Sequence, residues 1–122
     1  MRGIFFALER EKIPLILYAK NTARHHAAQV AAGIKILSID HTENLRQLRD
    51  KLPPATVLQG NLDPALMTST PRQVAAGTRE LLQQMSTTTG HILNLGHGIT
   101  PDAKIENVET LVATTRAWQN PS

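Results

Sequence analysis

The sequence predicts an α/β protein built from four βα units with parallel strands. Short apolar runs bounded by polar breaks recur four times, and a stretch with helical spacing of apolar residues follows each run. The runs stand roughly 20 to 35 residues apart, which suits a βα unit and is too long for a hairpin. Four such units form either an open sheet or half of a (β/α)8 barrel, because a complete barrel needs about 250 residues.

The four apolar runs are the predicted strands, and they are Ile13–Ala19, Ile34–Ile39, Ala55–Gln59 and His91–Leu95. Each run is short and largely apolar, as is typical of parallel strands that are covered on both faces. The opening residues, Arg2 to Lys12, are predicted to form a helix that leads into the first strand.

The first two connecting helices follow from composition and spacing. The alanine-rich stretch Ala23–Ala32 is followed by Gly33, a residue type that commonly ends helices. A shorter helix is predicted after Thr42, where three leucines repeat at helical spacing, namely Leu45, Leu48 and Leu52.

A capping box predicts the start of the third connecting helix. Thr70 and Gln73 have the required spacing, and Pro71 stands at the first helical position. The buried face of this helix is predicted to contain Val74, Thr78, Leu81, Leu82 and Met85. The last helix is predicted to be capped by Thr100 or Asp102. Its buried face is predicted to contain Ile105, Val108, Leu111, Val112, Thr115 and Trp118.

Composition limits the class of protein. The 122 residues are 41% hydrophobic and 19% charged, and no linker divides them, so residues 1–122 are predicted to form one domain. The chain has no cysteine, which excludes disulfides and thiolate chemistry and fits a reducing, cytoplasmic compartment. The longest apolar stretch is far shorter than a membrane span. The net charge of +3 is interspersed and aromatic residues are few, so we expect a small-molecule partner and neither nucleic acid nor membrane.

Polar residues follow each predicted strand, at the end where parallel α/β proteins place their sites. These four groups are Lys20-Asn21-Thr22, Asp40-His41-Thr42, Gly60 to Pro64, and Gly96-His97-Gly98. We expect them to meet at one edge of the sheet. Ordinary βα turns also use asparagine, aspartate and glycine, so position alone assigns no chemistry.

The most specific of these groups is Gly96-His97-Gly98. Two glycines let the backbone turn sharply and leave the imidazole unobstructed. A histidine can donate a hydrogen bond, accept one, or carry a proton near neutral pH. His97 therefore either acts on a substrate or hydrogen-bonds neighbouring backbone, and its spacing is compatible with both roles.

Architectural roles are expected for the other polar residues. Asp63 before Pro64 has the pattern of a helix N-cap with proline at the first position. Asp40 is expected to accept hydrogen bonds from its own loop. No metal site is predicted, because His25 and His26 are adjacent in a predicted helix and point about 100° apart. The chain also has no histidine pair at the i, i+4 spacing.

Two motifs resemble the paired C-terminal signatures of the uroporphyrinogen decarboxylase family. They are Val57–Pro64, with the sequence VLQGNLDP, and Asn94–Ile99, with the sequence NLGHGI. Ile13–Lys20 resembles the strand that precedes them in the family, and Ser38–Asp40 resembles the next strand. Pro101 and Glu106–Val108 match the run into the final helix. The resemblance covers nearly the whole chain in order.

The resemblance implies the C-terminal half of a (β/α)8 TIM-type barrel. It also implies the decarboxylation of the four acetate side chains of uroporphyrinogen III to coproporphyrinogen III, a step of heme biosynthesis that uses no metal or organic cofactor. Among the family's substrate-contacting residues, only a histidine has a counterpart here. That residue is His97, which the resemblance implies is catalytic and substrate-binding, through a substrate carboxylate or through proton transfer. A homodimer, or pairing with the other barrel half, is expected.

The chain departs from the family pattern at several points. His41 stands where tryptophan is usual, and Ala103-Lys104-Ile105 replaces a run that usually contains threonine and proline. The family's two arginines and its pyrrole-binding aspartate have no counterpart, so the isolated chain is expected to be inactive. One alternative is an inactive or split half-barrel that needs a partner. Another is a relative of the corrinoid-dependent methyltransferases, although these usually have a zinc-binding cysteine where His97 stands.

Overall fold

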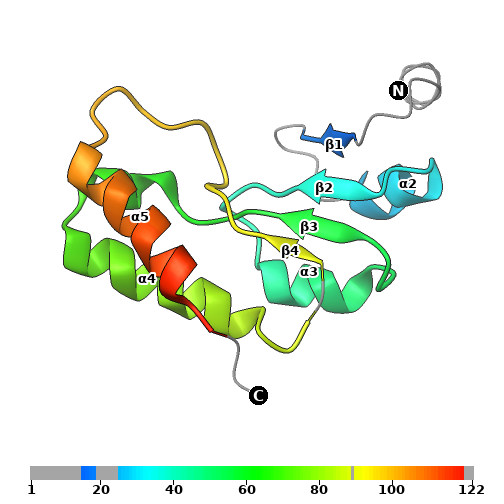
Figure 1. The fold of residues 1–122 in the computed structure, drawn as a ribbon. Helices are drawn as coiled ribbons and strands as arrows, with labels where there is room; N and C mark the ends of the chain where they lie inside the picture. The colour runs from blue at the N-terminus through cyan, green and yellow to red at the C-terminus, as the bar shows by residue number, and fades with distance from the viewer. Residues whose placement is uncertain (1–14, 19–24, 89, 120–122) are drawn as a thin grey trace.

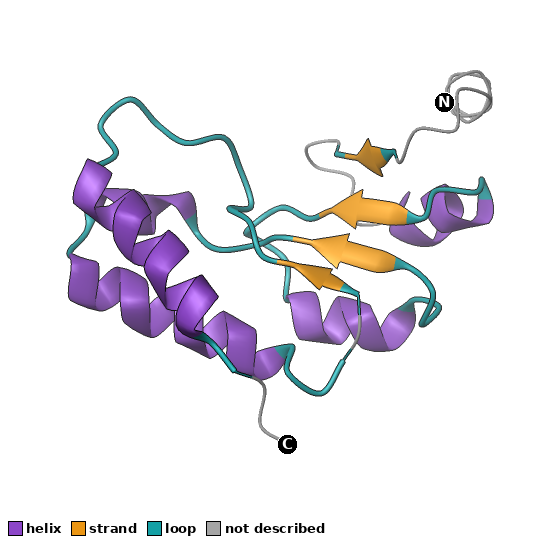
Figure 2. Ribbon diagram, in the orientation of Figure 1, coloured by secondary structure: helices purple, strands orange, loops and turns teal. Residues whose placement is uncertain are grey.

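The computed structural model describes residues 15–18, 25–88 and 90–119. In these ranges short strands alternate with helices, as Figure 2 shows. The predicted opening helix and the polar group Lys20-Asn21-Thr22 lie outside the described residues. None of the helices that the structure describes is long and apolar enough to cross a membrane.

Four parallel strands form one sheet in the order β1-β2-β3-β4. They are β1 (Ile16–Leu17), β2 (Ile36–Ser38), β3 (Val57–Gln59) and β4 (His91–Ile92). In Figure 1 the arrowheads of β2, β3 and β4 point the same way. The predicted parallel α/β architecture is therefore confirmed. Among the described residues, β2, β3 and β4 each cover only part of the predicted apolar run, because the remaining residues of the run do not join the ladder of the named strands.

The helices follow the strands in the predicted order. They are α2 (His26–Ala31), α3 (Leu45–Lys51), the 3-10 helix η2 (Pro64–Thr68), α4 (Pro71–Gln84) and α5 (Ile105–Ala117). The capping box is confirmed: the Thr70 hydroxyl accepts from the Gln73 N–H, and the Gln73 side chain accepts from the Thr70 N–H. Gly33 ends α2 with a φ of 104°, which favours glycine.

One face of the sheet is covered by α3 and α4, and the hydrophobic core lies there. Leu37 and Leu58 are neighbours across β2 and β3 and are almost fully buried. The cluster around them is completed by Ile34, Ile39, Leu45, Leu52, Leu62, Leu81 and Met85. The predicted buried face of α4 is confirmed, since Val74, Thr78, Leu81 and Met85 are buried and Leu82 is half-buried.

The opposite face of the sheet is open among the described residues. Side chains alternate between the two faces of a strand, so Ser38, Gln59 and Ile92 point away from the core. Ile92 is 41% exposed, and Ile16 on β1 is 48% exposed. The two outer strands, β1 and β4, pair on one side only within the described part of the chain. This open face and these two edges are available for further packing.

The prediction for the last helix was partly wrong. It begins at Ile105 after Lys104, and neither Thr100 nor Asp102 caps it. Ile105 is 75% exposed, whereas Asn107 is fully buried. Two contacts of Asn107 explain this, because its side-chain Nδ2 donates to the carbonyls of Met67 and Ser69, at 2.8 Å each. These bonds set the rotation of α5, which lies beside α4 in Figure 1, so Asn107 takes the buried position.

Candidate active site

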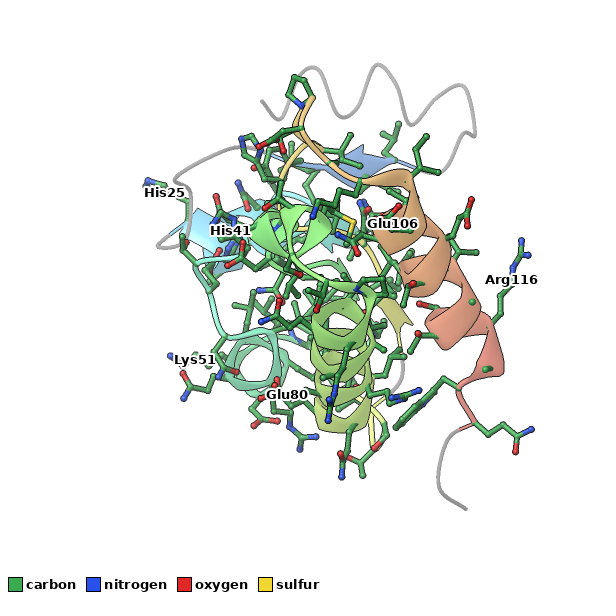
Figure 3. The ribbon with its side chains drawn as sticks, turned by 90° about the vertical axis from the view of Figure 1, so that its left-hand side faces the viewer. His25, His41, Lys51, Glu80, Glu106 and Arg116 are labelled. Carbon is green, nitrogen blue, oxygen red and sulfur yellow. The ribbon has the colours of Figure 1, made fainter. Side chains whose placement is uncertain are left out.

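The loops after β2, β3 and β4 meet at one edge of the sheet, as the sequence predicted. Figure 3 looks onto this edge, from the side toward which the strand arrowheads of Figure 1 point. The Asn61 side-chain Nδ2 donates to the carbonyls of Asp40, at 3.0 Å, and Glu43, at 2.5 Å. The Gly96 N–H donates to the Leu62 carbonyl at 2.8 Å. Asn61 therefore fixes the loop after β2, and the loop after β4 is tied to the loop after β3.

Gly96 is in direct contact with the loop after β2. A Cβ atom at this position would lie 2.3 Å from the backbone nitrogen of His41 and 2.6 Å from its Cα. At Gly98, by contrast, a Cβ atom would meet nothing within 4 Å. Neither glycine has a positive φ, although the backbone does bend at Gly96 and His97 as predicted. Close approach of two loops is what requires Gly96.

Asp40 carries a negative charge at this edge. Its Oδ1 accepts from the Thr42 N–H at 2.9 Å and lies 3.3 Å from the His41 Nδ1. The Thr42 N–H holds the pKa of the Asp40 carboxyl below its usual value, although burial acts in the opposite direction. The nearby imidazoles of His41 and His97 lower this pKa further. The predicted loop hydrogen bonding of Asp40 is confirmed, and its carboxylate is ionised at neutral pH.

His97 is exposed on the loop after β4. Its Nδ1 lies 3.1 Å from the carbonyl oxygen of Gly98. Because a carbonyl can only accept, Nδ1 carries the proton in the neutral ring, and Nε2 is left with its lone pair. Nε2 makes no hydrogen bond within the described residues. His97 can therefore take up a proton at Nε2, or donate from Nε2 when the ring is charged.

A cavity of about 370 Å³ lies beside His97 on the open face of the sheet. Its lining residues are Tyr18, Ser38, Asn94, Leu95, His97, Gly98 and Ile99. No acidic residue is among them, and hydroxyl, amide and imidazole groups provide the polar surface. Tyr18 and Ser38 were missed as site residues by the sequence reasoning. Strand alternation could have identified Ser38, because it places this side chain on the face of the sheet opposite the core.

The remaining candidates have structural roles. Asp63 caps η2, with its Oδ1 accepting from the Ala65 N–H at 2.9 Å, which confirms the predicted N-cap. His26 is buried, with its Nε2 2.9 Å from the Glu43 Oε2. His25 is exposed, and Figure 3 shows it pointing outward. Within the described ranges, no group of three histidine or acidic side chains is placed to hold a metal ion.

A parallel α/β sheet with a histidine and an open cavity at the carboxyl edge of its strands has the organisation of barrel-type α/β enzymes. The sequence profile described as Uroporphyrinogen decarboxylase (URO-D) matches residues 1–118. The chain belongs to this family, whose fold is a TIM barrel, and it matches a partial region of that barrel.

Curated relatives agree with this assignment. The uroporphyrinogen decarboxylase of Magnetococcus marinus is 39% identical over 121 residues, which are 95% of this chain and 34% of that protein. The protein of the same name from Coxiella burnetii is 38% identical over 101 residues, covering 83% of this chain and 28% of the relative. The one from Tolumonas auensis is 34% identical over 121 residues, covering 99% and 34%. The chain thus spans about a third of the length of these relatives.

Proposed function

We propose that this chain is the C-terminal part of a uroporphyrinogen decarboxylase. The reaction removes carbon dioxide from the four acetate side chains of uroporphyrinogen III and gives coproporphyrinogen III. The observation that carries the proposal is the position of His97. In this chain, which belongs to the family, the Nε2 of His97 makes no hydrogen bond within the described residues and lies beside an open cavity at the carboxyl edge of the strands.

The chemistry of the reaction gives His97 a role. Breaking the bond between the methylene carbon and the carboxylate leaves an electron pair on that carbon as carbon dioxide departs. The carbon must then accept one proton to become a methyl group. A charged imidazole can donate that proton from Nε2, or can hold a substrate carboxylate through the same atom. We assign His97 to the catalytic site and to substrate binding on this basis.

The rest of the site is proposed to come from a partner. The two outer strands and one face of the sheet are open in the described part of the chain, and the relatives are about three times longer. Residues 1–122 would therefore act as one portion of the barrel domain, completed by the other half, and the complete protein would form a homodimer. Strand edges of this kind favour pairing over a free monomer. A cytoplasmic location is proposed from the lack of cysteine.

Complementation tests this proposal. The chain is mixed with the separately expressed remainder of the Magnetococcus marinus relative, and coproporphyrinogen III is measured after incubation with uroporphyrinogen III. We expect the mixture to be active and each piece alone to be inactive. His97→Ala should lower the rate of the mixture about 100-fold or more. His25→Ala is the matched control, because His25 is exposed and points outward.

Two results would count against the proposal. If a folded chain bound the remainder of the relative and the complex formed no product, the assigned reaction would be wrong. If the isolated chain decarboxylated uroporphyrinogen at the rate of the mixture, the need for a partner would be wrong.

A further inference from the structure

The open face of the sheet carries a polar pair that the reaction described above does not use. Ser38 at the end of β2 and Gln59 at the end of β3 are direct neighbours in the parallel ladder. The Gln59 Nε2 donates to the Ser38 Oγ at 3.2 Å. Both side chains point away from the hydrophobic core, and Ser38 lines the cavity beside His97.

This hydrogen bond leaves the Ser38 hydroxyl hydrogen available for a further acceptor. One lone pair of Oγ accepts from Gln59, so the hydroxyl hydrogen has to point elsewhere. Within the described residues, that hydrogen has no acceptor. Ser38, which lines the cavity, can therefore donate a hydrogen bond to an occupant of the cavity while its oxygen accepts from Gln59.

The other polar groups of the cavity suit the same kind of ligand. The Tyr18 hydroxyl and the Asn94 amide can both donate, and neither side chain makes a hydrogen bond within the part of the chain that is described. His97 adds a donor when its ring is charged. Asp40, whose carboxylate interacts with the imidazole of His97, is not among the lining residues and accepts from the Thr42 N–H. A carboxylate, which only accepts, would meet donors and no acidic side chain within the lining of the cavity.

We propose that Ser38, hydrogen-bonded to Gln59, forms with Tyr18 and Asn94 a subsite that binds one carboxylate arm of the substrate next to His97. The cavity volume of about 370 Å³ is at the lower end of ordinary ligand pockets and suits one side chain with part of its pyrrole ring. This inference rests on the proposed function, since it names the contacts of that same substrate.

The test is a binding titration of the 122-residue chain with uroporphyrin III, the stable fluorescent oxidised form that keeps all eight carboxylates. Ser38→Ala should weaken binding about 10-fold or more, because a hydrogen bond to a charged group is lost. Ser38→Thr keeps the hydroxyl and suits a strand, so it should retain wild-type binding. Gln59→Glu should weaken binding as well, since a carboxylate there accepts the Ser38 hydrogen and repels the ligand. Ser86→Ala is the matched control, because Ser86 is a half-buried serine outside the cavity lining and bonds only to the Gln83 carbonyl within the described residues.

The outcomes separate this inference from the proposed function. Equal binding by wild type and a folded Ser38→Ala variant, checked by circular dichroism, would overturn the subsite and leave the proposed function standing. Wild-type chain that does not bind uroporphyrin would overturn the subsite, whereas the proposed function is tested separately by the complementation assay. The subsite would be supported if binding is weakened in Ser38→Ala and Gln59→Glu and is retained in Ser38→Thr and Ser86→Ala. Equal weakening in Ser38→Thr would also overturn it, since the hydroxyl would then not be what matters.

Discussion

Gly96→Ala should destabilise the protein much more than Gly98→Ala, although the two glycines flank the same histidine. A Cβ atom at Gly96 would lie 2.3 Å from the His41 nitrogen and 2.6 Å from its Cα and Cβ. Carbon atoms that are not bonded normally stay about 3.5–4.0 Å apart. The three atoms are fixed to the backbone, so no rotamer change relieves the clash, and the loops after β2 and β4 must separate by about 1 Å or more. Overpacking of this kind costs about 1–3 kcal/mol.

The assay is urea unfolding followed by circular dichroism, with thermal unfolding as a second measurement. For a domain of this size, a loss of about 1–3 kcal/mol lowers Tm by roughly 4–12 °C. Gly98→Ala should change the free energy of unfolding by no more than about 0.5 kcal/mol, because the added methyl group enters open space. Equal stability of the two variants would refute the loop contact.

Three further predictions concern stability. Asn107→Asp should lower the free energy of unfolding by about 3 kcal/mol and Asn107→Ala by about 2 kcal/mol, measured by urea unfolding, because two buried carbonyls lose their donors. Thr70→Ala removes the hydroxyl of the capping box and should cost about 1 kcal/mol in the same assay, with a smaller loss for Gln73→Ala. Burial lowers the pKa of His91 below its usual value of about 6.5, although its hydrogen bond to the Gly60 carbonyl acts the other way. The unfolded chain therefore binds the proton more readily, and stability should fall as pH drops below about 6.5. In His91→Gln the loss of stability between pH 7.5 and 5.5 should be smaller than in the wild type. An unchanged loss of stability would contradict the assignment of this pH dependence to His91.

Most of the fold could be predicted from the sequence because its signals are local. Buried parallel strands appear as short apolar runs. The capping box that marks the start of α4 is a motif of only four residues, Thr70–Gln73. The rotation of α5 could not be predicted in this way. It depends on hydrogen bonds from Asn107 to carbonyls about 40 residues earlier, and these bonds outweigh the apolar pattern that favoured burial of Ile105.

The candidate site was predictable in position but not in its contacts. The carboxyl ends of parallel strands meet at one edge, so the sequence placed His97 near Asp40 correctly. The close approach of Gly96 to His41 could not be predicted, because His41 is 55 positions away and belongs to another loop. The pairing of Ser38 with Gln59 requires the register between β2 and β3, which the apolar runs alone do not determine.

His97 and the cavity edge beside it are proposed to face the substrate, and histidine NMR tests this placement directly. The imidazole signals of the 122-residue chain are recorded while uroporphyrin III is added, with assignments from single histidine variants. We expect the His97 signal to shift with saturation, while the signals of His26, buried against Glu43, and His91, bonded to the Gly60 carbonyl, stay in place. A saturable shift at His26 or His91 with none at His97 would contradict the account.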